Sequence, residues 1–300
     1  MTSVIELSRA LLLALNGPIH PERGIHRDVP EDDYHRWHAV SKSWLDALLN
    51  SPAHLRYYLE HPTEPTEAKR IGSAVHRALL EPERFDEMYV RGPPGNWTLK
   101  ANRDAVAELR AGFPTRLVLH EEEYDAILGA RDAVYNHPVA SKLFDNPEWG
   151  YEVSACWEHP DIYEGQGILC KARADILRPD IGCIVDLKKV RSASRSSFQR
   201  SLALYRYAAQ ASWYLRGFNS VFGTHTFESF AFIAVEEEPP HGVAVYEVTP
   251  EDIRATDRQN LRLLRQYAEC AFRDEWPGYP EHITYAELPE WARYALAEDL

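Results

Sequence analysis

The spacing of apolar residues along the chain changes near residue 150. Before that point apolar positions recur every three or four residues, as in the stripe Ile71, Ala74, Val75, Ala78 and Leu79, and this spacing predicts helices. After it, short runs rich in β-branched and aromatic residues lie between turn residues, which predicts strands. Helices, then a hairpin and a strand, then helices and further strands are typical of an α/β domain whose mixed sheet is flanked by helices.

Helix-start signals and apolar runs predict the individual elements. We expect helices over residues 51–60, 66–80, 101–109, 121–135, 138–143, 194–201, 203–216 and 250–273. We expect strands over residues 151–157, 167–177, 183–190, 226–236 and 243–248. Residues 1–40 are expected to form an N-terminal helix and an irregular arm, and residues 41–300 one main domain that ends in a Pro-broken strap.

The stretch from Lys171 to Lys189 contains the most informative polar residues. Asp175 lies on the first of its two predicted strands, and Asp186 and Lys188 share one face of the second. Buried carboxylates are costly unless they are paired or bind a cation. The stretch therefore predicts either a divalent metal site with an ammonium beside it or a structural ion pair. Glu152, on the strand before, is either a third carboxylate of that site or an exposed strand residue.

Two helices carry polar residues that point to the same site. Gly72 and His76 lie four residues apart on one helix face, and a glycine inside a helix costs about 1 kcal/mol relative to alanine, so it usually marks a close approach. A single helical histidine is more often a hydrogen-bonded core residue. In the later helix Tyr207, Gln210 and Tyr214 form one stripe, where an inward-facing glutamine needs hydrogen-bond partners.

The net charge of −13 argues against nucleic acid binding, but the distribution of charge does not. Residues 187–227 contain no Asp or Glu, yet they hold Lys188, Lys189, Arg191, Arg195, Arg200, Arg206 and Arg216. Such a window after a candidate metal site favours a polyanion-binding patch over a solvated helix face.

The cysteines and the hydropathy pattern exclude several classes of protein. The four cysteines are widely spaced without a CxxC pair, which argues against zinc and disulfide frameworks. An apolar run of about 18 residues is missing, so we expect no membrane partner and a cytoplasmic location.

Carboxylates, a lysine and a basic patch are what hydrolysis of a phosphodiester requires. Hard oxygen ligands from Asp175, Asp186 and, where it joins the site, Glu152 suit Mg²⁺ or Mn²⁺ better than zinc. Lys188 could orient or help to deprotonate the attacking water and screen developing charge. The basic residues would hold backbone phosphates of the substrate.

These residues resemble a known signature. Asp175 followed by Asp186-Leu187-Lys188 is similar to the D…(D/E)xK motif of the PD-(D/E)xK nuclease superfamily, whose core is restriction-endonuclease-like. Gly72 to His76 resembles the GxxxH motif of the RecB-like branch, and Gln210 to Tyr214 its QxxxY helix. GIHRDVPEDDYH, SKSWLDALLNSPAHLRYY, GSAVHRALLEPERF, GILCKARADIL and YAAQASWY together look like the RecE-type (exonuclease VIII) group of phages and prophages.

The resemblance covers residues 24–295 and implies a Mg²⁺-dependent 5′→3′ exonuclease on ends of linear double-stranded DNA. It also implies a ring-like homo-oligomer and a single-strand annealing protein as partner in recombination. Its motifs imply a metal site and catalytic positions in this chain: His76, Asp175, Asp186 and the Leu187 carbonyl as metal ligands, Glu152 as the acidic strand residue, Lys188 as the catalytic lysine, and Gln210 and Tyr214 lining the site.

We expect the DNA contacts to come from Lys171, Arg173, Lys189, Arg191, Arg195, Arg200 and Arg206. Lys189 stands where the family usually has Thr, which leaves the catalytic set intact but alters phosphate contacts. Cysteines of the kind that hold an iron–sulfur cluster in relatives are missing, so we expect no cluster. The alternatives are a structure-specific endonuclease on the same fold, and a non-catalytic protein that binds DNA or a phage partner.

Overall fold

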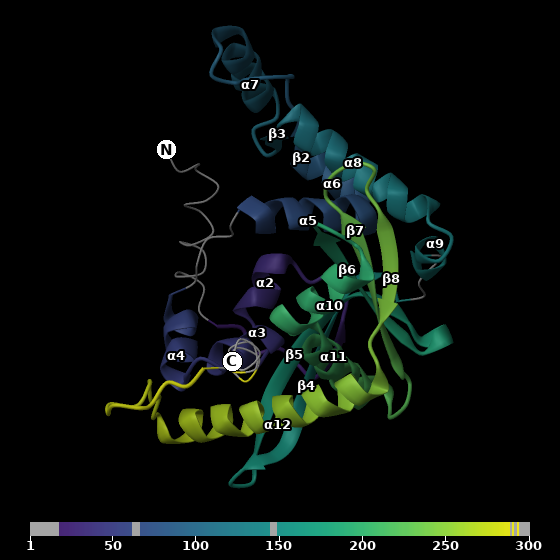
Figure 1. The fold of residues 1–300 in the computed structure, drawn as a ribbon. Coiled ribbons are helices and arrows are strands. Elements are labelled where there is room, and N and C mark those ends of the chain that lie inside the picture. Colours follow the sequence, from purple (N-terminus) through teal and green to yellow (C-terminus); the bar gives the residue numbers. More distant parts are fainter. Residues whose placement is uncertain (1–17, 62–66, 145–148, 289, 291–292, 294–300) are drawn as a thin grey trace.

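The computed structural model describes residues 18–61, 67–144, 149–288, 290 and 293. Their centre is a six-stranded sheet in the order β1-β4-β5-β6-β7-β8 (Figure 1). β6 and β7 run parallel, and the other neighbouring pairs are antiparallel, so the sheet is mixed as the sequence predicts. The strands are β1 (Gly24–His26), β4 (Tyr151–Tyr163), β5 (Gln166–Arg178), β6 (Cys183–Val190), β7 (Ser229–Glu236) and β8 (Val243–Glu247).

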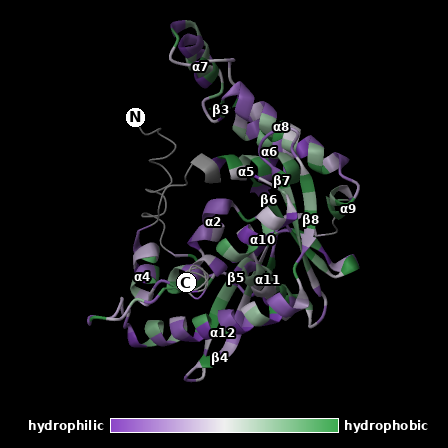
Figure 2. Ribbon diagram, in the orientation of Figure 1, coloured by the Kyte–Doolittle hydropathy of each residue, from purple (hydrophilic) through white to green (hydrophobic). Residues whose placement is uncertain are grey.

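Helices cover both faces of this sheet, and each layer of helices closes its own apolar core (Figure 1). One layer contains α3 (Lys42–Leu48), α4 (Pro52–Glu60), α10 (Arg195–Leu204), α11 (Tyr207–Phe222) and α12 (Pro250–Arg273). The other contains α5 (Glu67–Leu80), α6 (Pro82–Met88), α8 (Glu121–Asn136) and α9 (Ala140–Phe144). Figure 2 shows strands β7 and β8 mainly in the hydrophobic colour, whereas α12 has hydrophilic segments along its length.

A smaller unit lies between α6 and α8. The short strands β2 (Tyr89–Arg91) and β3 (Leu117–Leu119) pair in parallel, and α7 (Lys100–Gly112) connects them. In Figure 1, α7 projects away from the rest of the molecule.

The hairpin of β4 and β5 is longer than the sequence predicts. We expected strands over residues 151–157 and 167–177, but strand pairing continues to Tyr163 and Gln166. Glu164 and Gly165 make the turn, and both adopt positive φ angles, 49° and 71°, which a tight hairpin of this kind requires. β6, by contrast, has the bounds that its apolar run predicts.

Strands β5 and β6 separate in the middle of the sheet. They pair only from Ile176 with Val185 to Arg178 with Cys183, although β6 pairs with β7 over its whole length. Beyond this point the Leu187 amide donates to the Asp175 carboxylate, with 2.6 Å between N and Oδ2. Separation of the strands therefore turns Asp175 toward the gap between them.

The sequence predicts one helix over residues 203–216, but the chain breaks there. α10 ends at Leu204, and Arg206 adopts a left-handed conformation, φ 52° and ψ 46°, before α11 begins at Tyr207. Contacts from α3 hold this break, because Lys42 donates to the Tyr205 carbonyl and Asp46 pairs with Arg206. Helix periodicity does not reveal such a break, since its cause lies about 160 residues away in the chain.

The described part of the N-terminal arm joins the sheet. β1 pairs with β4, and α2 (Glu31–Arg36) follows it. The expected N-terminal helix lies outside the described residues, as does part of the C-terminal strap. The described strap has mostly exposed residues, but Trp276 packs against the core. None of the helices in the described part of the chain combines the length and apolarity needed to cross a membrane.

Candidate active site

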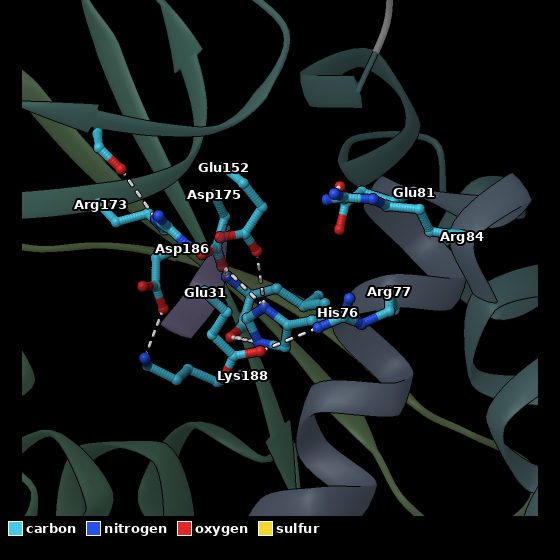
Figure 3. A network of polar contacts seen from close by, with 12 residues as sticks. Glu31, His76, Arg77, Glu81, Arg84, Glu152, Arg173, Asp175, Asp186 and Lys188 are labelled. Atoms are coloured by element: carbon cyan, nitrogen blue, oxygen red, sulfur yellow. Dashed lines mark hydrogen bonds and ion pairs between the residues drawn. The ribbon is translucent and has the colours of Figure 1, made fainter. Parts of the chain in front are cut away.

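Three potential metal ligands meet where β5 leaves β6. His76 comes from α5, Glu152 from β4 and Asp175 from β5, and Figure 3 shows their side chains converging. The His76 Nδ1 atom lies 3.5 Å from Asp175 Oδ2 and 4.0 Å from Glu152 Oε1. The His76 Nε2 atom lies 2.9 Å from the Leu187 carbonyl oxygen. One imidazole and two carboxylates are thus brought together from three elements, and the Leu187 carbonyl of β6 lies at the other nitrogen of the imidazole.

The backbone of Glu152 is part of this geometry. Its φ of 53° is a left-handed conformation, which is uncommon for a non-glycine residue and costs of the order of 1 kcal/mol. At this residue β4 changes the face that it presents, because Tyr151 packs in one core and Val153 in the other. The turn directs the carboxylate of Glu152 to His76 and Asp175, rather than to solvent as an ordinary strand glutamate.

Electrostatics within the cluster indicate a cation site. Burial raises the pKa of Asp175, and the nearby Asp186 carboxylate raises it further. Burial and the charge of Asp175 raise the pKa of Glu152 to about 7. Close carboxylates are unfavourable in their charged forms, and a divalent cation removes that cost. Oxygen donors with one imidazole fit Mg²⁺ or Mn²⁺, so these residues suit the metal that the family implies.

Asp186 and Lys188 lie beside the three-residue cluster. Lys188 Nζ is 2.6 Å from Asp186 Oδ2, and Gln210 Nε2 donates to Asp186 Oδ1 over 2.5 Å. Burial lowers the pKa of Lys188, but the charges of Asp186 and Asp175 more than offset this, so the pKa is raised. Lys188 is therefore an ammonium at neutral pH. The ion pair with Lys188 and the hydrogen bond from Gln210 satisfy the Asp186 carboxylate, which explains why these polar residues inside β6 tolerate burial.

Helix α11 supplies the rest of the wall around Lys188. Gln210 and Tyr214 lie on it as the stripe predicts, and burial raises the pKa of Tyr214. The ring of Tyr207 lies 4.9 Å from the Lys188 ammonium, close enough for a cation–π contact. The polar-aromatic stripe thus faces the site, with Tyr207 as the member next to the lysine.

One contact next to this cluster could not be predicted from the sequence. Arg77, which follows His76, binds Glu31 of α2 with 2.9 Å between NH2 and Oε2, and the pair lies beside the site in Figure 3. It ties α2 to the helix that carries His76. Only the acidic first turn of α2 marked Glu31 in the sequence, and that signal concerns helix capping rather than a site.

Several of the expected DNA-binding residues have other partners, and Lys171 and Arg173 are the clearest corrections. Lys171 is buried, and its ammonium donates to the carbonyl oxygens of Tyr34, His35 and Trp37 at the end of α2. Arg173 donates to Ser154 and to the Val29 carbonyl. Both residues therefore hold the N-terminal arm on the sheet, and these contacts occupy the donors that we expected to meet DNA.

The acid-free window is neutralised in part by acids from other segments. Lys189 pairs with Glu237, Arg206 with Asp46 and Arg216 with Asp257. The window predicted more free positive charge than the fold presents, because charge counted along the chain ignores partners brought in by folding. Arg191, Arg195 and Arg200 remain exposed, and contact with DNA stays a prediction for them.

A cavity of about 1470 Å³ opens next to Lys188. Lys188, Gln210 and Tyr214 line it at the site, and α2, α3, α4, the α10–α11 break and the end of α12 supply the remaining lining. We call this cavity the groove. It provides space on the α11 side of the site, whereas α5 and its histidine lie on the other side of the sheet.

Comparison with known proteins finds a family and a similar fold. The family described as "PDDEXK-like domain of unknown function (DUF3799)" matches residues 41–289. Among curated proteins none matches the sequence. A crystal structure described as "Putative exonuclease", from Eubacterium rectale, is 13% identical and has a TM-score of 0.51, and the match covers 86% of this chain and 97% of that one. A structure of SSO0001 is 16% identical with a TM-score of 0.37, covering 94% and 90%.

Proposed function

Because the chain belongs to the PDDEXK-like family DUF3799, and so to the PD-(D/E)xK nuclease superfamily, we propose that it is a Mg²⁺-dependent exodeoxyribonuclease acting on ends of linear double-stranded DNA. The observation that carries the proposal is the convergence of His76, Glu152 and Asp175 beside the Asp186–Lys188 pair. Mg²⁺ is proposed from the donor set, with Mn²⁺ as a substitute.

The residues have distinct roles in this proposal. Asp175, Glu152 and His76 would hold the metal, with Asp186 as a further carboxylate next to them. The Leu187 carbonyl, which the resemblance implies as a ligand, accepts from His76 Nε2 and orients the imidazole. The metal, when bound, neutralises phosphate charge and supplies an acidified water. Lys188 offers N–H donors to a water or a phosphate oxygen and stabilises negative charge that develops there. Gln210 holds Asp186, and Tyr207 supports the lysine through its ring.

The test is release of nucleotides from linear duplex DNA in Mg²⁺, with labels at the 5′ and 3′ ends. We expect Asp186→Asn to abolish release and Lys188→Met to lower the rate by about 10²-fold or more. Lys100→Met on the projecting α7 is the matched control and retains full activity. Equal activity of wild type and Asp186→Asn would refute the assignment of the site.

Two other outcomes would favour the alternative functions. Cutting of closed circular DNA points to a structure-specific endonuclease, since an exonuclease needs an end. Tight, salt-sensitive DNA binding without cleavage in Mg²⁺ or Mn²⁺ points to a non-catalytic binding protein. The complete set of carboxylates and lysine favours the exonuclease over the second of these.

From the resemblance to the RecE-type group we further propose 5′→3′ polarity, a ring-like oligomer, and cooperation with a single-strand annealing protein in the cytoplasm during recombination. Release of the 5′ label before the 3′ label would support the polarity. A mass measurement in solution gives the oligomer, and a monomer at all concentrations would contradict the ring.

A further inference from the structure

The groove differs in charge from the rest of the chain. The chain carries a net charge of −13, and six lysine and arginine side chains line the groove against three carboxylates. Lys171 among them is buried, and Arg36 and Lys188 pair with acids outside the lining. One of the three lining carboxylates, Asp46, is shared by two cations, Lys42 and Arg206. The part of the groove beside Tyr205, where two cations share one carboxylate, therefore has an excess of positive charge that is complementary to a phosphate backbone.

The groove is also lined by nine aromatic residues, and the rings of two are open to solvent. Tyr205, at the α10–α11 break, is 55% exposed, and Tyr58, on α4, is 43% exposed. Leu204, which precedes Tyr205, is 74% exposed. Large apolar side chains that are this exposed and lie at the rim of a cavity are typical of a binding surface.

Contacts with α3 hold the backbone at Tyr205 in place. Lys42 Nζ lies 2.7 Å from the Tyr205 carbonyl oxygen, and Asp46 holds both Lys42 and the left-handed Arg206. Left-handed residues other than glycine persist where surrounding contacts enforce them, and they gather at functional sites. The rings of Tyr205 and Tyr207 stack, with centroids 5.5 Å apart and planes at 28°. Because Tyr207 also contacts Lys188, an aromatic series leads from the rim to the lysine.

We propose that the groove binds a single strand of DNA whose bases are unpaired, and that Tyr205 is a base-stacking residue at its rim. Stacking needs free base faces, which in a duplex are covered by neighbouring bases. A basic groove with exposed aromatic rings is the arrangement by which proteins bind single strands without sequence preference. This inference rests on the proposed nuclease function, since it places in the groove nucleotides of the strand that reaches Lys188.

The experiment measures binding of a single-stranded oligonucleotide that contains 2-aminopurine, whose fluorescence falls on stacking. The unaltered protein is used in EDTA, so the strand is not cut. We expect the single strand to bind more tightly than a blunt duplex of the same length, with quenching. Tyr205→Ala should weaken binding about tenfold or more and remove the quenching, whereas Tyr205→Phe should retain both.

Tyr57→Ala is the matched control, because Tyr57 is 63% exposed on α4 but does not line the groove. Equal binding by Tyr205→Ala and Tyr57→Ala would overturn the inference, as would equal losses in Tyr205→Ala and Tyr205→Phe. Either result leaves the nuclease proposal standing. That proposal fails separately, if the wild-type protein with Mg²⁺ releases no nucleotides.

Discussion

Replacing Glu152 by glutamine should stabilise the metal-free protein at alkaline pH. The pKa of Glu152 is raised from an ordinary 4.5 to about 7, through burial and the charge of Asp175. The folded state therefore holds this proton more tightly than the unfolded state does. The cost of ionising Glu152 is fully present above pH 7 and disappears as the pH falls below 4.5.

The size of the effect follows from this pKa difference. It corresponds to about 3 kcal/mol, and the partial exposure of the side chain reduces the expected value to roughly 2 kcal/mol. Glutamine keeps the shape of the side chain and removes the charge. We therefore expect Glu152→Gln to raise the free energy of unfolding by about 2 kcal/mol at pH 8 in EDTA, and by little at pH 4.5.

Urea unfolding at several pH values measures the difference. Glu164→Gln is the matched control, because Glu164 is exposed in the turn after β4 and has a nearly equal φ, 49° against 53°. The Glu164→Gln substitution should change the free energy of unfolding little at any pH. Mg²⁺ should stabilise the wild type more than Glu152→Gln, since it binds only the folded carboxylates. A stability gain that is the same at pH 4.5 and pH 8, or no gain at pH 8, would refute the electrostatic argument.

Other substitutions test the packing around the site. Gly72→Ala should raise the free energy of unfolding by about 1 kcal/mol, because among the described residues outside its own helix backbone and its two chain neighbours no atom lies within 4 Å of the added Cβ. Gly217→Ala should lower it by about 1–3 kcal/mol, because the Cβ would lie 2.5 Å from the Trp157 ring. Thermal unfolding of both variants checks the opposite signs, and two changes of the same sign would contradict the geometry. Lys171→Met should cost about 3 kcal/mol, since it leaves carbonyl oxygens of α2 without a donor, and urea unfolding measures this. Normal stability of Lys171→Met would instead show that the ammonium is dispensable there.

The main elements of the fold follow from local patterns. The apolar run of β6 has its predicted bounds, Cys183 to Val190, because side chains alternate along a strand wherever it lies. α5 and α12 follow from apolar periodicity and from the Thr249-Pro250 start. The break at Arg206 could not be predicted, because Lys42 and Asp46 enforce it from a distant helix.

The residues of the candidate site could be predicted from the sequence, but their arrangement could not. Asp175, Asp186 and Lys188 are marked by spacing on strands, and His76 and Gln210 by their motifs. That Asp186 is paired with Lys188 and Gln210, while Glu152 joins His76 and Asp175, depends on where β5 leaves β6. The basic window shows the same limit, since Lys189 and Arg206 meet acids of remote segments.

The sequence by itself determined which residues can do the chemistry, because residue type and local periodicity fix what each side chain offers and which face of a strand or helix carries it. Only the tertiary structure decided which of these residues meet, which charged side chains lack an ion-pair partner among the described residues, and where a DNA strand could lie. These depend on pairing across more than a hundred residues. Tyr205 at the rim of the groove owes its position to such pairing, whereas Asp175 owes its contact with Leu187 to the place where β5 leaves β6.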